Sequence, residues 1–402
     1  MALPTIAVVD LVSSGWTAGG TYSEVCAKSL VQGSLSDRVL FLSRRTPARL
    51  QGVEIVPLPV AANLPLEGPA RHLLRRAPRG QSFRGEGRVR QALRLKDPAH
   101  PVWVASEAGA DVVFPVVAPP AIRPRGLGLV GWIPDFQHAA MPENFSRAEI
   151  EDRDLAFQRI GERCHRVVVS SNAVASDFVR LLPEYGDKVV VVPFPSRYVL
   201  TPLGRADEGV AGKYGLPMRY VLCANQFWSH KNHLLLVDSI AVLKSRGLEV
   251  TVVLTGLLSD YRDPTLRLLS DLLQAIATAG VHDQVRILGL VPLADFDDLL
   301  RGSAGVVQPS GYEGWSTTIE DAKALGKQVI CSDIPVHREQ VPDALAFFSL
   351  DPGSCADALR RLWERPQGAD LELTALGRAT AAVASHAVAL RDVCAAAVGV
   401  AR

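Results

Sequence analysis

One short segment, residues 311–326, combines carboxylates with a run of hydroxyl side chains between turn glycines. A strand-like run at 304–308 precedes it and a helical pattern opens near Thr317, so free backbone N–H groups and a positive dipole end point out of the turn. Such a place binds anions, phosphate above all. Glu313 lies before the helix and can face hydroxyl groups, whereas Asp321 lies about one turn inside it. This spacing predicts a ligand with a phosphate between two polyol ends, as in a nucleotide sugar.

The composition is that of a globular, soluble chain with more than one domain. The chain has 402 residues, of which 48% are hydrophobic and 21% charged, and its net charge of +1 gives no pull toward nucleic acid. No apolar run approaches the roughly 20 residues of a membrane helix, and no signal peptide is visible, so we expect a cytoplasmic location. Arginine outnumbers lysine and alanine is abundant, which indicates a GC-rich bacterium. Six scattered cysteines predict buried thiols rather than a metal or redox site.

Short apolar strands alternate with helical segments along the chain, which predicts parallel sheets covered by helices on both faces. The polar, glycine-bearing stretch 201–215 is the best interdomain linker. We therefore expect one α/β domain at 1–200, a similar one at 216–375, and a C-terminal helix at 376–402 that crosses back to the first. The predicted strands are 6–9, 39–42, 54–57, 112–114, 129–133, 167–170 and 189–192, then 220–224, 250–255, 285–288, 304–308, 328–331 and 346–349.

A glycine-bearing turn also follows the first predicted strand. In open parallel sheets, ligands bind beyond the carboxyl ends of the strands. Gly19 and Gly20 follow the first strand before a helix, where a glycine pair lets the backbone approach a ligand closely. We therefore expect the first domain to meet the ligand there, opposite the segment that begins at Gly311.

With two halves, a crevice and this motif, the chain resembles a family 4 retaining glycosyltransferase of the GT-B architecture, in which two Rossmann-like domains face each other across a cleft. Residues 311–326 are similar to the family's Glu-x7-Glu segment, with Glu313 as the first acid and Asp321 where a second glutamate is usual. The resemblance implies that Glu313 contacts the donor sugar and Asp321 the nucleotide ribose. The expected phosphate contacts are Ser316, Thr317 and Thr318.

The segment around Lys231 resembles the family's diphosphate-binding segment, in which an arginine is followed five residues later by a lysine. Lys231 matches that lysine, and Gln226 replaces the arginine, so neutralising the diphosphate depends more on Lys231. Gly256, which ends a predicted strand, resembles a position that borders the nucleotide. His230 and His233 flank Lys231 on what we interpret as a loop and first helical turn, and we expect no metal there.

Residues 132–143 resemble the segment that lines the first domain's side of the cleft. The family often places a histidine or an aspartate there against the donor sugar and the acceptor, which makes Asp135 and His138 candidates. The alternative is that Asp135 serves capping and turn chemistry. Asp152 and Asp154 mimic an Asp-x-Asp metal motif, but they lie in a charged helical stretch, and we expect no metal there.

A basic segment lies between two strands of the first domain. Residues 71–96 carry nine basic side chains, with Glu86 almost the only acid. Two interpretations stay open: a solvated helix and loop, or a peripheral surface for a phosphorylated or membrane-borne acceptor. Asp333 and Glu339, near the end of the region of resemblance, are expected to hold their loop rather than to touch sugar.

The resemblance implies a hexosyltransferase that moves a sugar from a GDP- or UDP-sugar to a small-molecule, saccharide or lipid-linked acceptor, without metal or cofactor. Residues 1–200 would bind the acceptor, and 216–375 the nucleotide sugar. Retention of configuration needs no protein carboxylate as nucleophile, because the acceptor attacks from the leaving-group face and the diphosphate takes its proton. Two alternatives remain: a nucleotide-sugar epimerase or related enzyme of the same architecture, and a nucleotide-sugar binder without activity. The second alternative is considered because Gln226 and Asp321 stand where the family usually has an arginine and a glutamate.

Overall fold

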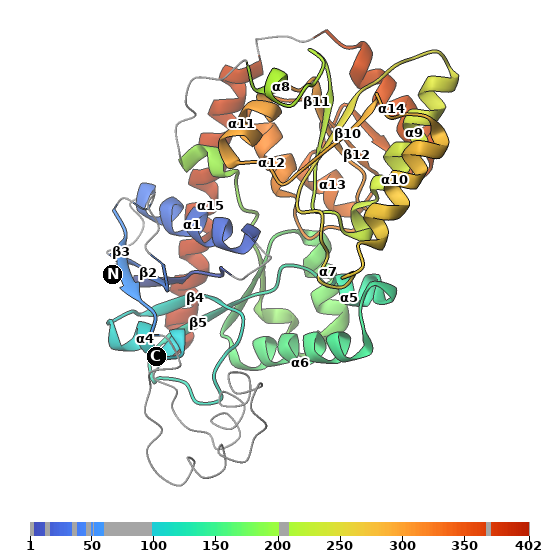
Figure 1. The fold of residues 1–402 in the computed structure, drawn as a ribbon. Coiled ribbons are helices and arrows are strands. Elements are labelled where there is room, and N and C mark those ends of the chain that lie inside the picture. The colour runs from blue at the N-terminus through green and yellow to red at the C-terminus, as the bar shows by residue number, and fades with distance from the viewer. Residues whose placement is uncertain are drawn as a thin grey trace.

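Two parallel sheets organise the computed structural model, which describes residues 4–12, 17–33, 38–45, 50, 52–59, 99–200, 209–366 and 371–401. One sheet has seven strands in the order β3-β2-β1-β4-β5-β6-β7, and the other has six in the order β10-β9-β8-β11-β12-β13 (Figure 1). The strands are β1 (Thr5–Val9), β2 (Arg38–Ser43), β3 (Glu54–Pro57), β4 (Val112–Val116), β5 (Gly128–Trp132), β6 (Arg166–Val169), β7 (Val189–Val191), β8 (Val221–Ala224), β9 (Val252–Thr255), β10 (Val285–Gly289), β11 (Gly305–Gln308), β12 (Val329–Ser332) and β13 (Ala346–Phe348).

All thirteen predicted strands are confirmed, each end within two residues of its expected place. The central strands are buried because helices cover both faces of a parallel sheet: every residue of β4, β5, β9, β11 and β12 is buried. Each sheet reverses its strand order once, between β1 and β4 and between β8 and β11. Those two reversals are the topological switch points at which ligands of such sheets bind.

Helices connect the strands and pack on the sheets (Figure 1). In the first domain they are α1 (Thr17–Gln32), α4 (Pro101–Glu107), α5 (Gln137–Ala140), α6 (Arg147–Arg163) and α7 (Asn172–Leu181). After residue 208 they are α8 (Val210–Lys213), α9 (His233–Ser245), α10 (Arg267–Ala279), α11 (Leu293–Gly302), α12 (Thr317–Ala324), α13 (Pro335–Gln340), α14 (Pro352–Glu364) and α15 (Leu371–Ala401). Short 3-10 turns lie at Pro142–Asn144, Pro183–Lys188, Arg197–Leu200 and Ser229–Lys231.

The C-terminal helix α15 begins at Leu371, five residues before the expected start, and runs from the second domain to the first (Figure 1). Its residues Leu390, Cys394 and Ala397 are fully buried in the core of the first domain, beside strands β4 and β5. By length and composition alone, its Gly377–Ala401 stretch could also cross a membrane. The burial of its apolar residues instead makes it a core helix that joins the two domains.

In the first half, the glycine pair after β1 lies elsewhere than predicted. Gly19 and Gly20 do not form a turn before the helix but lie within the first turn of α1. Gly20 is buried there, and a Cβ atom on it would lie 2.5 Å from the Val12 side chain, so the missing side chain serves packing inside the domain. The basic segment 71–96 and residues 201–208 of the linker lie outside the described residues.

Candidate active site

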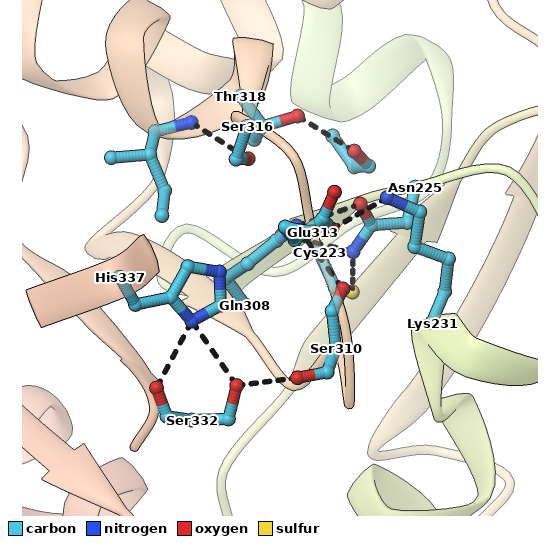
Figure 2. Close-up of polar contacts among 12 residues, drawn as sticks. Cys223, Asn225, Lys231, Gln308, Ser310, Glu313, Ser316, Thr318, Ser332 and His337 are labelled. Atoms are coloured by element: carbon cyan, nitrogen blue, oxygen red, sulfur yellow. Dashed lines mark hydrogen bonds and ion pairs between the residues drawn. The ribbon is translucent and has the colours of Figure 1, made fainter. Parts of the chain in front are cut away.

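The loops that follow β8 and β11 meet at the switch point of the second sheet. At the end of β8, the carbonyl of Ala224 accepts a 2.8 Å hydrogen bond from Thr318 Oγ1 of α12. Asn225 and Gln308, directly after β8 and at the end of β11, exchange amide hydrogen bonds: Asn225 Nδ2 donates to Gln308 Oε1 at 2.9 Å, and Gln308 Nε2 donates to Asn225 Oδ1 at 3.1 Å. This buried amide pair fixes the two loops relative to each other (Figure 2).

Lys231 and Glu313 form a buried ion pair in the centre of this site (Figure 2). Lys231 Nζ lies 2.5 Å from Glu313 Oε1, and their side chains are 14% and 8% exposed. Gln308 Nε2 donates a second hydrogen bond, of 2.9 Å, to the same oxygen. Burial by itself raises the pKa of the Glu313 carboxyl, but the Lys231 ammonium outweighs it and lowers that pKa to about 2. The carboxylate is therefore ionised at neutral pH.

Gln308 is a site residue that the sequence analysis missed. Its side chain is fully buried, and its amide nitrogen also lies 3.3 Å from Ser310 Oγ. A polar residue at the end of an otherwise apolar strand was the available signal, since a buried amide needs partners. The amide therefore links the strand end to the carboxylate of Glu313.

The predicted start of α12 is confirmed, and Ser316 is its N-cap. Ser316 Oγ accepts from the N–H of Ile319 at 3.4 Å, and the N–H of Ser316 donates to Gln340 Oε1 at 3.0 Å. Of the four N–H groups that a helix start leaves without helical partners, those of Thr317 and Thr318 remain for an anion. Of the three residues expected to contact phosphate, Ser316 thus has its N–H engaged by Gln340.

Asp321 faces the segment that connects the two domains. Its Oδ1 accepts a 2.5 Å hydrogen bond from Ser196 Oγ, and its Oδ2 lies 3.3 Å from Arg197 Nε. Arg197 also pairs with Asp297, so its charge is shared between two carboxylates. Burial raises the pKa of Asp321 to about 6, although Arg197 and Ser196 act in the opposite direction. Asp321 therefore holds the connecting segment, whereas the resemblance implied a contact with the nucleotide ribose.

Gly256 and Gln226 lie where the loops after β8 and β9 touch. Gly256 has a φ of +150°, and a Cβ atom there would lie 2.0 Å from the carbonyl oxygen of Asn225. Only glycine fits this close approach. Gly256, which was expected to border the nucleotide, thus lies next to the loop that carries Lys231. Its close contact with Asn225 sets the path of the backbone at Gln226.

On the first domain's side, Asp135 and His138 have different surroundings. Asp135 Oδ1 accepts from the N–H of Gln137 at 3.0 Å, which is the turn role weighed against a site role. Its Cβ atom lies near Gly314, beside the Glu313 loop. His138 is enclosed by aromatic rings with a fully buried side chain, and its Nε2 lies 3.0 Å from Asp154 Oδ1. The structure thus brings Asp135 to the Glu313 loop and buries His138 inside the first domain.

Histidines near Lys231 are buried and neutral. Burial lowers the pKa of both His230 and His233 to about 3, and the Lys231 charge adds to the effect. His233 stacks on Phe227 with 4.4 Å between ring centroids. Across the part of the chain that the structure describes, no group of three His, Cys, Asp or Glu side chains is placed to hold a metal ion.

Sequence comparison places the second domain in a known family. Residues 218–365 match the family model of glycosyl transferases group 1. The chain is 24% identical to mannosylfructose-phosphate synthase of Agrobacterium fabrum over 57% of its own length, and 24% identical to O-antigen chain mannosyltransferase B of Escherichia coli over 52%. It spans about half the length of these curated relatives, 51% and 54% respectively.

Solved structures match the whole chain. The Anabaena protein HepE in complex with UDP and glucose has a TM-score of 0.58 at 16% identity, covering 97% of this chain and 95% of HepE. Sucrose-phosphate synthase from Thermosynechococcus elongatus has a TM-score of 0.60 at 14% identity, covering 99% and 97%. At such identities the likeness shows the fold, and the fold is GT-B. The match to glycosyl transferases group 1 thus covers the second domain, and the likeness in fold extends over both domains.

Proposed function

We propose that the protein is a retaining hexosyltransferase that uses a nucleotide-diphosphate sugar, with UDP and GDP as the favoured nucleotides. The Lys231–Glu313 pair carries this proposal, because it places one ammonium and one ionised carboxylate at the switch point of the second sheet. A diphosphate needs the cation, and sugar hydroxyls donate to the carboxylate. The match of this domain to group 1 glycosyltransferases supports the same assignment.

The proposed mechanism divides the donor between these groups. Lys231 and the amides of Thr317 and Thr318 stabilise the charge that develops on the departing diphosphate. Glu313 holds the donor sugar through its hydroxyl groups. The acceptor attacks from the leaving-group face and passes its proton to the diphosphate, so configuration is retained. In this scheme Lys231 supplies the positive charge, and transfer needs no metal or cofactor.

The names of the relatives support a proposal for the acceptor, and the cysteines of this chain support one for its location. The names of mannosylfructose-phosphate synthase and sucrose-phosphate synthase point to sugar phosphates, and that of O-antigen chain mannosyltransferase B points to a growing polysaccharide. We propose a saccharide or a sugar phosphate as acceptor, with a lipid-linked saccharide as the alternative. A cytoplasmic location agrees with the six buried free cysteines, because reduced thiols persist in a reducing compartment.

Thermal unfolding with nucleotides tests the donor site first. UDP or GDP at 100 times its dissociation constant stabilises the native state by about 2.7 kcal/mol, which appears as a rise in melting temperature. Turnover is then measured with UDP- and GDP-hexoses, with and without EDTA, and the anomeric configuration of the product is read by NMR. Nucleotide binding without any transfer or donor hydrolysis indicates the non-catalytic binder. Conversion of the donor sugar into its epimer indicates the epimerase.

A further inference from the structure

Helix α7 of the first domain is bonded to the second domain at its N-terminal end. Glu339, at the end of α13, accepts from the N–H groups of Asn172 and Ala173 at distances of 2.8 to 3.3 Å. A carboxylate suits this place, because the start of a helix carries unpaired N–H groups and a partial positive charge. The expectation that Glu339 holds its own loop is therefore wrong: it caps a helix of the other domain.

Tyr312, the residue directly before Glu313, also reaches the first domain. Its hydroxyl oxygen accepts from the N–H of Phe136 at 3.0 Å, and its O–H donates to Asp177 Oδ2 of α7 at 3.3 Å. A phenol group has one proton to donate and lone pairs to accept, so both bonds form together. Burial raises the pKa of Tyr312, and the hydroxyl keeps the proton that it donates.

Gly314, the residue directly after Glu313, is bonded to the first domain as well. Its carbonyl oxygen accepts from Ser171 Oγ at 3.1 Å. A Cβ atom at this position would lie 2.1 Å from the carbonyl oxygen of Pro134, so the two backbones touch. Both neighbours of Glu313 are thus attached to one domain, while its carboxylate pairs with Lys231 of the other.

We propose that Tyr312 is a positioning residue that makes the orientation of Glu313 depend on contact between the two domains. The proposal rests on the function above, in which Glu313 holds the donor sugar. When the domains separate, Tyr312 loses both of its partners at once and the loop around Glu313 is released. When they meet, the loop is fixed at both sides of Glu313, and the carboxylate is directed at Lys231. Sugar recognition is then complete only in the closed molecule.

The test compares Tyr312→Phe with Tyr220→Phe in the full chain. Phenylalanine keeps the ring and removes only the hydroxyl. Tyr220 is the matched control, because its buried hydroxyl donates to the carbonyl of Leu299 at 2.8 Å entirely within the second domain. Hydrogen exchange of the peptides covering residues 134–141 and 311–318 reports on the two sides of the contact without any need for turnover.

In Tyr312→Phe we expect both peptides to exchange about tenfold faster, which is the effect of one or two lost hydrogen bonds. The turnover number should fall by a similar factor, and the ratio of turnover between different donor hexoses should become smaller. The affinity for the nucleoside diphosphate alone should stay within about twofold of the wild-type value. Tyr220→Phe leaves both peptides at the wild-type rate. Unchanged exchange at 134–141 in Tyr312→Phe, or an equal rise in Tyr220→Phe, overturns the positioning role.

A second variant guards against misfolding, and the readouts separate the two proposals. Glu339→Ala removes the acceptor of the N–H groups of Asn172 and Ala173 in α7 without touching Tyr312. The change should speed exchange at residues 171–178 and, more weakly, at 311–318. No change at 311–318 contradicts the dependence on domain contact. A wild-type protein that turns over no donor refutes the proposed function, while the exchange data still decide whether Tyr312 links the loop to the first domain.

Discussion

Lys231 and Glu313 lie 2.5 Å apart and almost out of contact with water. A buried pair of this kind adds little net stability, because removing both charges from water costs about as much as their attraction returns. Removing one partner is different, since the other charge is left buried and alone. A pair that adds little stability agrees with the proposed role, in which the ammonium meets the diphosphate and the carboxylate meets the sugar.

Single and double variants of the pair separate stability from activity. Lys231→Met should lower the free energy of unfolding by about 3 kcal/mol, because Glu313 is left unpaired. Adding Glu313→Gln should restore most of that loss. Neither protein should transfer sugar. The measurements are urea unfolding and donor turnover; a double variant less stable than the single one contradicts the interpretation, and residual transfer in either contradicts the assigned roles.

Buried histidines should make the protein sensitive to acid. Burial lowers the pKa of His230 and His233 to about 3 and that of His386 to about 4, whereas unfolding returns each to about 6.5. Between these values the unfolded state binds more protons, so stability falls as pH falls from about 7 to 4. Each histidine contributes about 1.4 kcal/mol per pH unit there.

His233→Leu removes one of these groups from a site where neither ring nitrogen has a hydrogen-bond partner. The variant should show a shallower loss of stability between about pH 6 and 4, by about 1.4 kcal/mol per unit. Chemical unfolding at a series of pH values checks the slope. A slope equal to that of the wild type would mean that His233 is already protonated in the folded protein.

At the scale of elements, the loops after parallel strands bring the site together. Gly256, directly after β9, lies against the backbone of Asn225, and no side chain fits between them. The strands themselves were predictable, because continuous apolar runs of four to six residues between glycines and polar turns have few other uses in an α/β chain. The start of α1 was not, because Gly19 and Gly20 resemble turn residues, and only contact with Val12 explains a glycine within the helix.

Gly256→Ala should destabilise the protein by about 3 kcal/mol or more and weaken nucleotide binding, because the added carbon displaces the start of the Lys231 loop. Gly212→Ala is the matched control. Gly212 lies in α8 with open space around its Cα, and alanine there should be neutral or stabilise by up to about 1 kcal/mol. Unfolding midpoints and nucleotide titration measure both; equal effects of the two changes would refute the role of Gly256.

At the scale of the whole molecule, α15 and the hydrogen bonds to α7 connect the two domains. The helix fills the core of the first domain although its own sequence follows the second. A helix of this composition also passes as a membrane span, and only its packing distinguishes the two. The first domain is thus completed by the last residues of the chain.

Leu390→Ala tests this dependence on α15. Leu390 is fully buried in the first domain's core, so the variant should lose about 2 to 5 kcal/mol of stability. Val388, which is 42% exposed two residues earlier on the same helix, provides the control, and Val388→Ala should change stability by less than about 0.5 kcal/mol. Urea unfolding of the intact chain measures both, and similar losses would contradict the packing of α15.

Local sequence determined the strands, the division into two sheets, the start of α12 at Ser316, and the candidates Lys231 and Glu313. These follow from apolar periodicity, capping chemistry and residue type, all of which act over a few neighbouring positions. Only the tertiary structure showed that Gln308 holds Glu313, that Asp321 meets Arg197, that His138 is enclosed, and that Tyr312 and Glu339 reach the first domain. Each of these contacts joins residues distant in the sequence, and it forms because long-range packing brings strand ends and domains together. The residue types of segment 311–326 are thus read from the sequence, whereas its geometry depends on contacts with both domains.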